Sequence, residues 1–231
     1  GAVVDAAPAV APLRIATLGW ELAAPAAALA ATPSVEVAPE ATLDELEKRL
    51  ARGGSDAQGA DVAVLPLPSF VVAYEHLSAL KLQAFLVTGF SHGREEVHAP
   101  AGALLKAPPG ADEVKIVSGG SESANVLALF SVDLLGVASS RIRLVTAEAD
   151  VKAAAFAGVV KGTTDTRKLA FSTADASRLV PIVAIAPKAV IDAREKDLQE
   201  WSKAWLDGLD AVAKDVPGIS RKLAAKANVP L

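Results

Sequence analysis

Short apolar runs alternate with longer stretches of helical periodicity along most of this 231-residue chain, and this alternation restricts the fold more than any single motif does. Repeated strand–helix units of this kind predict an α/β fold with mostly parallel sheets. The expected strands are residues 14–18, 34–38, 61–65, 82–88, 114–117, 142–145, 168–172 and 182–186. The expected helices are residues 21–31, 42–50, 69–77, 121–135, 148–157 and 187–215.

A break in this rhythm predicts two lobes. Residues 89–97 are polar, residues 107–111 are rich in proline and glycine, and the strand–helix pattern begins again at Val114. We therefore expect a flexible leader at residues 1–12, a first lobe from residues 13–88 and 187–231, and a second lobe from residues 92–186. Trp201, Trp205 and Leu209 recur every four residues in the last helix, so they are expected to anchor it to the core of the first lobe.

Composition excludes several classes of protein. A hydrophobic content of 52% argues against a disordered chain, and a net charge of -4 argues against a dedicated nucleic-acid-binding protein. No apolar run approaches the roughly 18 residues of a membrane-spanning helix. The absence of cysteine excludes disulfides, thiolate metal sites and cysteine nucleophiles. Three histidines leave little room for a histidine-rich metal centre, and we expect no metal and no cofactor.

The first candidate ligand-binding loop follows the strand at residues 14–18. Ligands of open α/β sheets collect at the carboxyl ends of strands and at helix N-termini. Thr17 lies at this end, Gly19 allows close approach of the backbone, and Trp20 offers a flat apolar wall with one hydrogen-bond donor. Packing of Trp20 in the core of the lobe is an equally weighted alternative.

A second candidate loop follows the strand at residues 61–65. Two prolines stiffen it, and Pro68 and Ser69 are its candidate ligand-binding residues. Ser69 is more readily interpreted as the N-cap of the next helix than as a ligand contact. Phe70 and Tyr74 lie one helical turn apart and are candidates for the same wall.

The third candidate is a turn of glycine and serine between a strand and a helix. Such a turn presents backbone N–H groups and hydroxyls, which suit an anion or a polar carbonyl group. Glu122 in the first helical turn would compete with a bound anion. The turn has neither the Walker spacing nor the G-x-G-x-x-G spacing. The candidate ligand-binding residues here are Ser118, Gly119, Gly120, Ser121 and Ser123.

The polar stretch between the expected lobes supplies Ser91, His92 and Arg94 as further candidates. The Arg94 guanidinium suits a carboxylate, sulfonate or phosphate group. A solvated hinge with local ion pairs is an alternative of at least equal weight. A catalytic set of His92, Glu95 and a serine has no support in their spacing, and neither G-x-S-x-G nor H-E-x-x-H occurs in the chain.

The order of these parts resembles that of periplasmic solute-binding proteins of ABC transporters, of the second structural type. The nearest group within that family is the receptors for nitrate, sulfonate, taurine and thiamin-precursor-like ligands. Four stretches carry the resemblance: RIATLGW, ADVAVLPLPSFVVAY, EVKIVSGGSESANVLALFSVDLLGV followed by IRLVTAEADVKAAAFAG, and RLVPIVAIAPKAVI. It extends over most of residues 13–220.

The resemblance implies a two-lobed receptor that makes and breaks no bond. It would capture a small polar or anionic organic solute in an inter-lobe cleft, close by hinge motion, and deliver the solute to an ABC permease. The solute would lie between the Thr17–Trp20 loop and the Ser118–Ser123 turn. The implied protein is a monomer in the periplasm or on the outer face of the cytoplasmic membrane. A membrane tether through a trimmed N-terminus is an alternative that stays open.

Two other classes of function stay open at this point. One is a cofactor-free enzyme on the same fold, of the lyase or the pyrimidine or thiamin-precursor synthesis type, which would need a positioned general base. No residue stands out for that role. The other is an interaction protein that keeps the lobes without binding a ligand.

Overall fold

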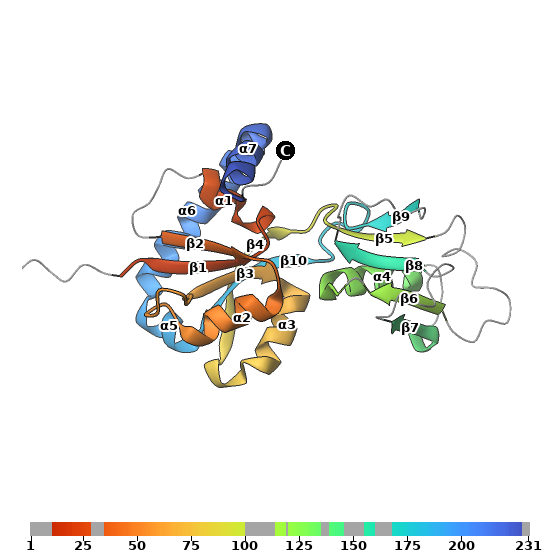
Figure 1. Cartoon of the computed structure of the whole chain (residues 1–231), viewed down its shortest axis with the longest axis horizontal. Helices are drawn as coiled ribbons and strands as arrows, with labels where there is room; N and C mark the ends of the chain where they lie inside the picture. The colour runs from red at the N-terminus through yellow and green to blue at the C-terminus, as the bar shows by residue number, and fades with distance from the viewer. Residues whose placement is uncertain are drawn as a thin grey trace, which may run out of the picture. The chain divides into compact units, whose positions relative to one another are not determined.

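The computed structural model describes residues 11–28, 35–99, 114–118, 120–134, 139–145, 155–159 and 168–227 (Figure 1). The chain divides into two compact units. The first consists of residues 1–65, 72–88 and 183–231, and the second of residues 66–71 and 89–182. Residues 66–71, expected in the first lobe, thus group with the second unit, and residues 183–186, expected in the second lobe, group with the first. None of the helices within the described ranges is both long and apolar enough to cross a membrane.

The first sheet has the strand order β2-β1-β3-β10-β4. β1 pairs in parallel with β2 and with β3, so that Ile15 lies opposite both Val37 and Val62. Every residue of β3 is buried, which explains why this strand is an unbroken apolar run. The strands are β1 (Leu13–Leu18), β2 (Val35–Glu40), β3 (Val62–Pro66), β4 (Leu82–Phe90) and β10 (Pro181–Pro187).

Helices α1 (Ala24–Ala28), α2 (Leu43–Arg52), α3 (Leu67–His76), α5 (Lys188–Ala193), α6 (Glu195–Lys214) and α7 (Val216–Ala227) accompany this sheet, with short 3-10 helices at Glu21–Ala23 and Ser78–Leu80. Thr42 and Glu45 have the three-residue spacing of a capping box in the sequence, and the start of α2 has the matching hydrogen bonds. The Thr42 hydroxyl accepts a bond from the Glu45 amide at 3.3 Å, and the Glu45 carboxylate accepts one from the Thr42 amide at 3.2 Å. This reciprocal pair is a capping box.

The stripe of aromatic residues on α6 is confirmed as a core element. Trp201 and Trp205 are only 4% and 1% exposed, and their ring centroids lie 5.0 Å apart. Phe85 of β4 meets Trp201 edge to face at 5.9 Å. Leu209 is half-buried. A Cβ at Gly208 would lie 2.7 Å from the Pro25 carbonyl oxygen, so this glycine lets α6 and α1 approach closely.

The prediction of one helix over residues 187–215 is wrong in its continuity. Arg194 has the non-helical angles φ −127° and ψ 28°, and it separates α5 from α6. Its guanidinium bonds to Asp61 and to the Ala11 carbonyl, contacts that local periodicity does not reveal.

Sequence reasoning also missed α7, which begins after Asp215. The Asp215 carboxylate accepts a bond from the Gly218 amide at 3.0 Å, as an N-cap does.

The second sheet has the strand order β7-β6-β8-β5-β9 and is mixed. β6 is parallel to β7 and β8, whereas β5 is antiparallel to β8 and β9. Helix α4 (Glu122–Leu134) packs on the sheet through Ala124, Leu127, Ala128 and Val132, which form a core with Val97 and Ile116. The strands are β5 (Glu95–Ala99), β6 (Val114–Ser118), β7 (Ile142–Val145), β8 (Ala155–Val159) and β9 (Lys168–Ser172), and a 3-10 helix spans Ser139–Arg141.

Two expectations for this sheet are wrong. The helix expected at residues 148–157 includes three residues of β8, while residues 148–154 lie outside the described part of the chain. A short apolar run has the same appearance in a buried strand as in a helix, so periodicity could not separate the two. Residues 89–97 were expected as a polar break in the strand–helix rhythm, but they include the start of β5. The charged Glu95 can lie in this buried strand because partners inside the protein satisfy its carboxylate.

Candidate functional site

The loop after β1 is shaped by its own hydrogen bonds. Thr17 is fully buried, and its hydroxyl donates to the Gly19 carbonyl at 2.9 Å. Gly19 has φ +96°, and its amide donates to the carbonyl of Glu40 at the end of β2, also at 2.9 Å. Only glycine adopts such a φ without strain. Thr17 and Gly19 therefore hold the loop in place, which leaves Trp20 as its exposed side chain.

Trp20 does not pack in the core. It is 39% exposed, so the alternative of a core tryptophan is wrong. Its carbonyl accepts the amide of Ala23 at 3.0 Å, which fixes the backbone at the start of the 3-10 helix. An indole held at the carboxyl end of a parallel strand is placed to stack on a ligand. That role stays a prediction for Trp20, as ligand contact does for Thr17 and Gly19.

The second candidate loop is part of a helix. Pro68 and Ser69 lie in the first turn of α3, which begins at Leu67. Proline is tolerated there because first-turn amides have no partner within the helix. The interpretation of Ser69 as an N-cap is wrong, since its hydroxyl donates to Glu122 Oε2 at 2.9 Å. Ser69 is buried, Phe70 is half-buried and Tyr74 is 51% exposed.

The turn before α4 is held together by serine hydroxyls. Ser118 Oγ accepts the Gly120 amide at 3.2 Å, and Ser121 Oγ accepts the Ala124 amide at 3.3 Å. Ser121 is thus the N-cap of α4. Ser123 is buried, with its Oγ 3.3 Å from that of Ser121. The predicted residue Gly119 lies outside the described residues. The structure brings the other four together in one turn at the end of β6.

Glu122 places a negative charge in the first turn of α4. It is half-buried and accepts the Ser69 hydroxyl, so its position is fixed. Carboxylates are stabilised at helix N-termini, where the partial charge is positive. The protein thus already fills with its own carboxylate the position that would attract an anionic ligand. Sequence reasoning identified this competition but not the Ser69 partner.

The polar stretch contains both exposed and buried residues. His92 is exposed. Ser91 is 5% exposed and donates to the carboxylate of Glu95, which is fully buried. Arg94 pairs with Glu95 Oε1 at 2.8 Å, so a ligand anion would have to compete with that carboxylate. The solvated-hinge alternative is therefore wrong for Ser91 and Glu95. Sequence reasoning also missed Thr173, a buried partner of Ser91 that directly follows β9.

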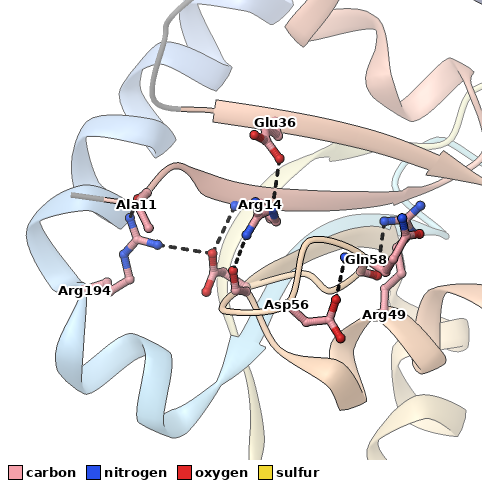
Figure 2. A network of polar contacts seen from close by, with 9 residues as sticks. Ala11, Arg14, Glu36, Arg49, Asp56, Gln58 and Arg194 are labelled. Carbon is pink, nitrogen blue, oxygen red and sulfur yellow. Dashed lines mark hydrogen bonds and ion pairs between the residues drawn. The ribbon is translucent and has the colours of Figure 1, made fainter. Parts of the chain in front are cut away.

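A separate polar network lies at the opposite ends of the strands in the first unit (Figure 2). Asp61 Oδ2 accepts the Arg14 amide at 3.0 Å and Arg194 Nη1 at 3.2 Å. Arg194 Nη2 donates to the Ala11 carbonyl at 3.0 Å, and Arg14 pairs with Glu36 at 2.9 Å. Asp61 directly precedes β3, and Arg14 is the second residue of β1, so the network lies at the amino ends of parallel strands. It ties α6 to the sheet and is structural.

The titratable groups give no sign of a metal centre in the part of the chain that the structure describes. No group of three or more His, Cys, Asp or Glu side chains there is placed to hold a metal ion. On the surface of α2, the hydrogen bond and charge of Asp44 raise the pKa of Lys48. This pair belongs to the helix surface and not to the candidate site.

The N-cap role of Ser121 changes how the turn before α4 can be tested. Gly120 has φ +76°, so alanine there would strain the backbone. Ser121→Ala is expected to lower the free energy of unfolding of the second unit by about 1 kcal/mol through loss of the cap. Ser121→Thr keeps a capping hydroxyl and should cost less. Urea titration followed by circular dichroism measures both variants, and equal losses would contradict the cap assignment.

Comparison with known proteins bears on the fold. No protein-family model matches the sequence, and a search of curated proteins finds no match. Among solved structures, 181 chains match. The periplasmic aliphatic sulphonate binding protein SsuA from Escherichia coli has a TM-score of 0.67 at 12% identity, over 96% of this chain and 80% of that one.

Two further solved structures are similar to this chain. The alkanesulfonate-binding protein SsuA from Xanthomonas axonopodis pv. citri, bound to MOPS, has a TM-score of 0.62 at 16% identity over 97% of this chain and 82% of its own. A conserved Candida albicans gene product with the generic periplasmic binding protein fold has a TM-score of 0.53 at 12% identity over 94% and 76%. The chain therefore has the periplasmic-binding-protein fold, which confirms the expected fold class.

Proposed function

We propose that this chain is an extracytoplasmic receptor of an ABC import system, which captures a small polar or anionic organic solute and delivers it to a permease. The observation that carries the proposal is Trp20, which has a 39% exposed indole and a hydrogen-bonded backbone just after the carboxyl end of β1, in a fold shared with periplasmic binding proteins. The sulfonate-binding proteins among the structural neighbours support a receptor role. The location we propose is the periplasm or the outer face of the cytoplasmic membrane.

The proposed binding residues come from one loop of each unit. In the first unit, Trp20 supplies an apolar wall, and Gly19 allows the backbone to approach the solute. In the second unit, the turn from Ser118 to Ser123 supplies polar groups at the N-terminus of α4. Both loops follow a strand at its carboxyl end, where α/β folds place their ligands. We propose that the solute lies in the cleft that the family resemblance implies.

Within the polar or anionic class, Glu122 favours a solute whose group at this turn is neutral. The Glu122 carboxylate would repel an anion there. The Ser69 hydroxyl already donates to Glu122, and the Ser121 hydroxyl already accepts the amide of Ala124. Replacing Glu122 with glutamine removes the charge and keeps an oxygen for the Ser69 hydroxyl. We expect this variant to bind anionic solutes roughly 2–5-fold more tightly, since charge at a helix N-terminus is worth about 0.3–1 kcal/mol. Neutral solutes should bind with unchanged affinity in a calorimetric titration.

Tryptophan fluorescence tests the proposal directly because the three tryptophans differ in exposure. Trp201 and Trp205 are buried, whereas Trp20 is exposed. Titration with a panel of alkanesulfonates, carboxylates, amides and nucleobase-like compounds should yield a saturable change with at least one compound. Trp20→Phe should remove that change, and Trp201→Phe should leave it. A saturable change that persists in Trp20→Phe would overturn the assignment of Trp20, and no change with any compound would count against the receptor function.

A further inference from the structure

Helix α7 of the first unit carries a charge opposite to that of the whole chain. The chain has a net charge of -4, but residues 216–231 contain three basic residues and no acidic residue. The three basic residues are Arg221, Lys222 and Lys226, and all of them are exposed on α7. We call them the basic face. Positive charge is therefore concentrated on one helix of an otherwise acidic protein.

The packing of α7 leaves the basic face open to solvent. Ile219 is 5% exposed and Leu223 is half-buried, and the helix packs against α1, whose sequence APAAA carries no charge (Figure 1). At about 100° per residue, the three basic residues span an arc of about 140° beside this buried stripe. Gly218 and Ala225 share the arc and are small, so no bulky side chain keeps a flat surface away from the three cations.

The protein does not neutralise the basic face with its own carboxylates. Within the part of the chain that the structure describes, none of the three side chains has an ion-pair partner. Elsewhere in the first unit, an exposed cation such as Lys188 lies beside a carboxylate, that of Asp192. Lys222 and Lys226 are one helical turn apart, where like charges repel each other. The helix dipole favours Lys226 near the C-terminus of α7 but not Arg221 in its middle, so the charge of the basic face calls for an anionic partner.

We propose that the basic face docks on the anionic headgroup surface of a lipid membrane. Such a surface presents many negative charges whose lateral positions adjust, which suits exposed cations without fixed partners. An acidic protein is the weaker candidate, because α7 has no aromatic residue and aromatic residues are enriched in protein interfaces. Each basic residue near an anionic surface strengthens binding roughly fivefold. This inference goes beyond the receptor function and involves no solute, so either can fail while the other holds.

Co-sedimentation of the whole chain with lipid vesicles tests this inference. We expect binding to phosphatidylcholine vesicles that contain about one third phosphatidylglycerol, and no binding to vesicles of phosphatidylcholine alone. Raising the salt from about 0.05 M to about 0.5 M should release the protein, because salt screens exposed charges. Replacing Arg221, Lys222 and Lys226 together with glutamine should weaken binding roughly tenfold or more. All three residues are exposed, so the circular dichroism spectrum of this variant should stay unchanged.

The matched control replaces Lys48, Lys188 and Lys196 together with glutamine. These are exposed lysines of the first unit that lie beside carboxylates, and their loss changes the net charge by the same amount. The control variant should keep most of the wild-type affinity for anionic vesicles. Unchanged binding of the basic-face variant, or an equal loss in the control, would overturn the inference. Wild-type protein that binds immobilised polyglutamate but no vesicle would overturn it as well and would indicate an acidic protein as the partner.

Discussion

Replacing Trp205 with alanine is expected to lower the free energy of unfolding of the first unit by about 3–5 kcal/mol, the range for large aromatic residues in cores. Trp205 is 1% exposed, and its ring lies 5.0 Å from that of Trp201, which in turn meets Phe85 of β4. Alanine would leave a cavity between α6 and its neighbours, because the crowded contact of Gly208 with the Pro25 backbone limits how far the helix can shift. Urea titration followed by circular dichroism measures the loss.

Leu206 provides the control for this substitution because it is the next residue of the same helix and is 43% exposed. Leu206→Ala is expected to change stability by no more than about 0.5 kcal/mol. Similar losses for the two variants would contradict the packing of α6. Unchanged stability of Trp205→Ala together with lost solute binding would make Trp205 a ligand group instead.

Asp61→Ala is expected to destabilise the first unit by about 2–4 kcal/mol, because it leaves two donors at the amino end of the sheet without their acceptor. Asp61 Oδ2 accepts both the Arg14 amide and Arg194 Nη1. The side chain of Arg194 is 20% exposed, so water replaces part of the lost interaction, and the effect should lie below that of a fully buried ion pair.

Asp56→Ala is the matched control for the Asp61 variant. Asp56 is an exposed carboxylate of the same connection, and it accepts the Gln58 amide at 2.7 Å. Its loss should cost about 1 kcal/mol or less. A double-mutant cycle of Asp61→Ala with Arg194→Ala isolates their coupling. A coupling of zero would show that the loss comes from the Arg14 amide alone and would contradict the role given to Arg194.

Local patterns predicted the parts of the fold that local physics determines. The Thr42 capping box, the buried run of β3 and the four-residue spacing of Trp201 and Trp205 each depend on residues close in sequence. The resemblance of four stretches, taken in order, predicted the periplasmic-binding-protein fold. The strand β8 was misassigned because its short apolar run is compatible with either periodicity until β5 and β6 pair with it.

The candidate site was predicted less completely because its contacts join residues far apart in the chain. Ser69 bonds to Glu122, 53 residues away, and Ser91 lies beside Thr173, 82 residues away. No spacing in the sequence reveals such pairs. A charged residue such as Glu95 predicts a solvent-exposed side chain until its buried partners are known. Ser172 at the end of β9 and Thr173 directly after it were a usable signal, since polar residues where a strand ends mark a position for side-chain hydrogen bonds.

A thermal-shift screen of the whole chain tests the receptor function most directly. The panel contains alkanesulfonates, carboxylates, amides, nucleobase-like compounds and apolar compounds, with product analysis of the same mixtures. At 100 times its Kd, a solute adds about 2.7 kcal/mol to stability, which raises the Tm by roughly 5–10 °C for a chain of this size. The receptor function predicts such a shift with at least one polar compound, no product, and its loss in Trp20→Ala. The contradicting result is a panel without any shift, or a compound that is converted to product.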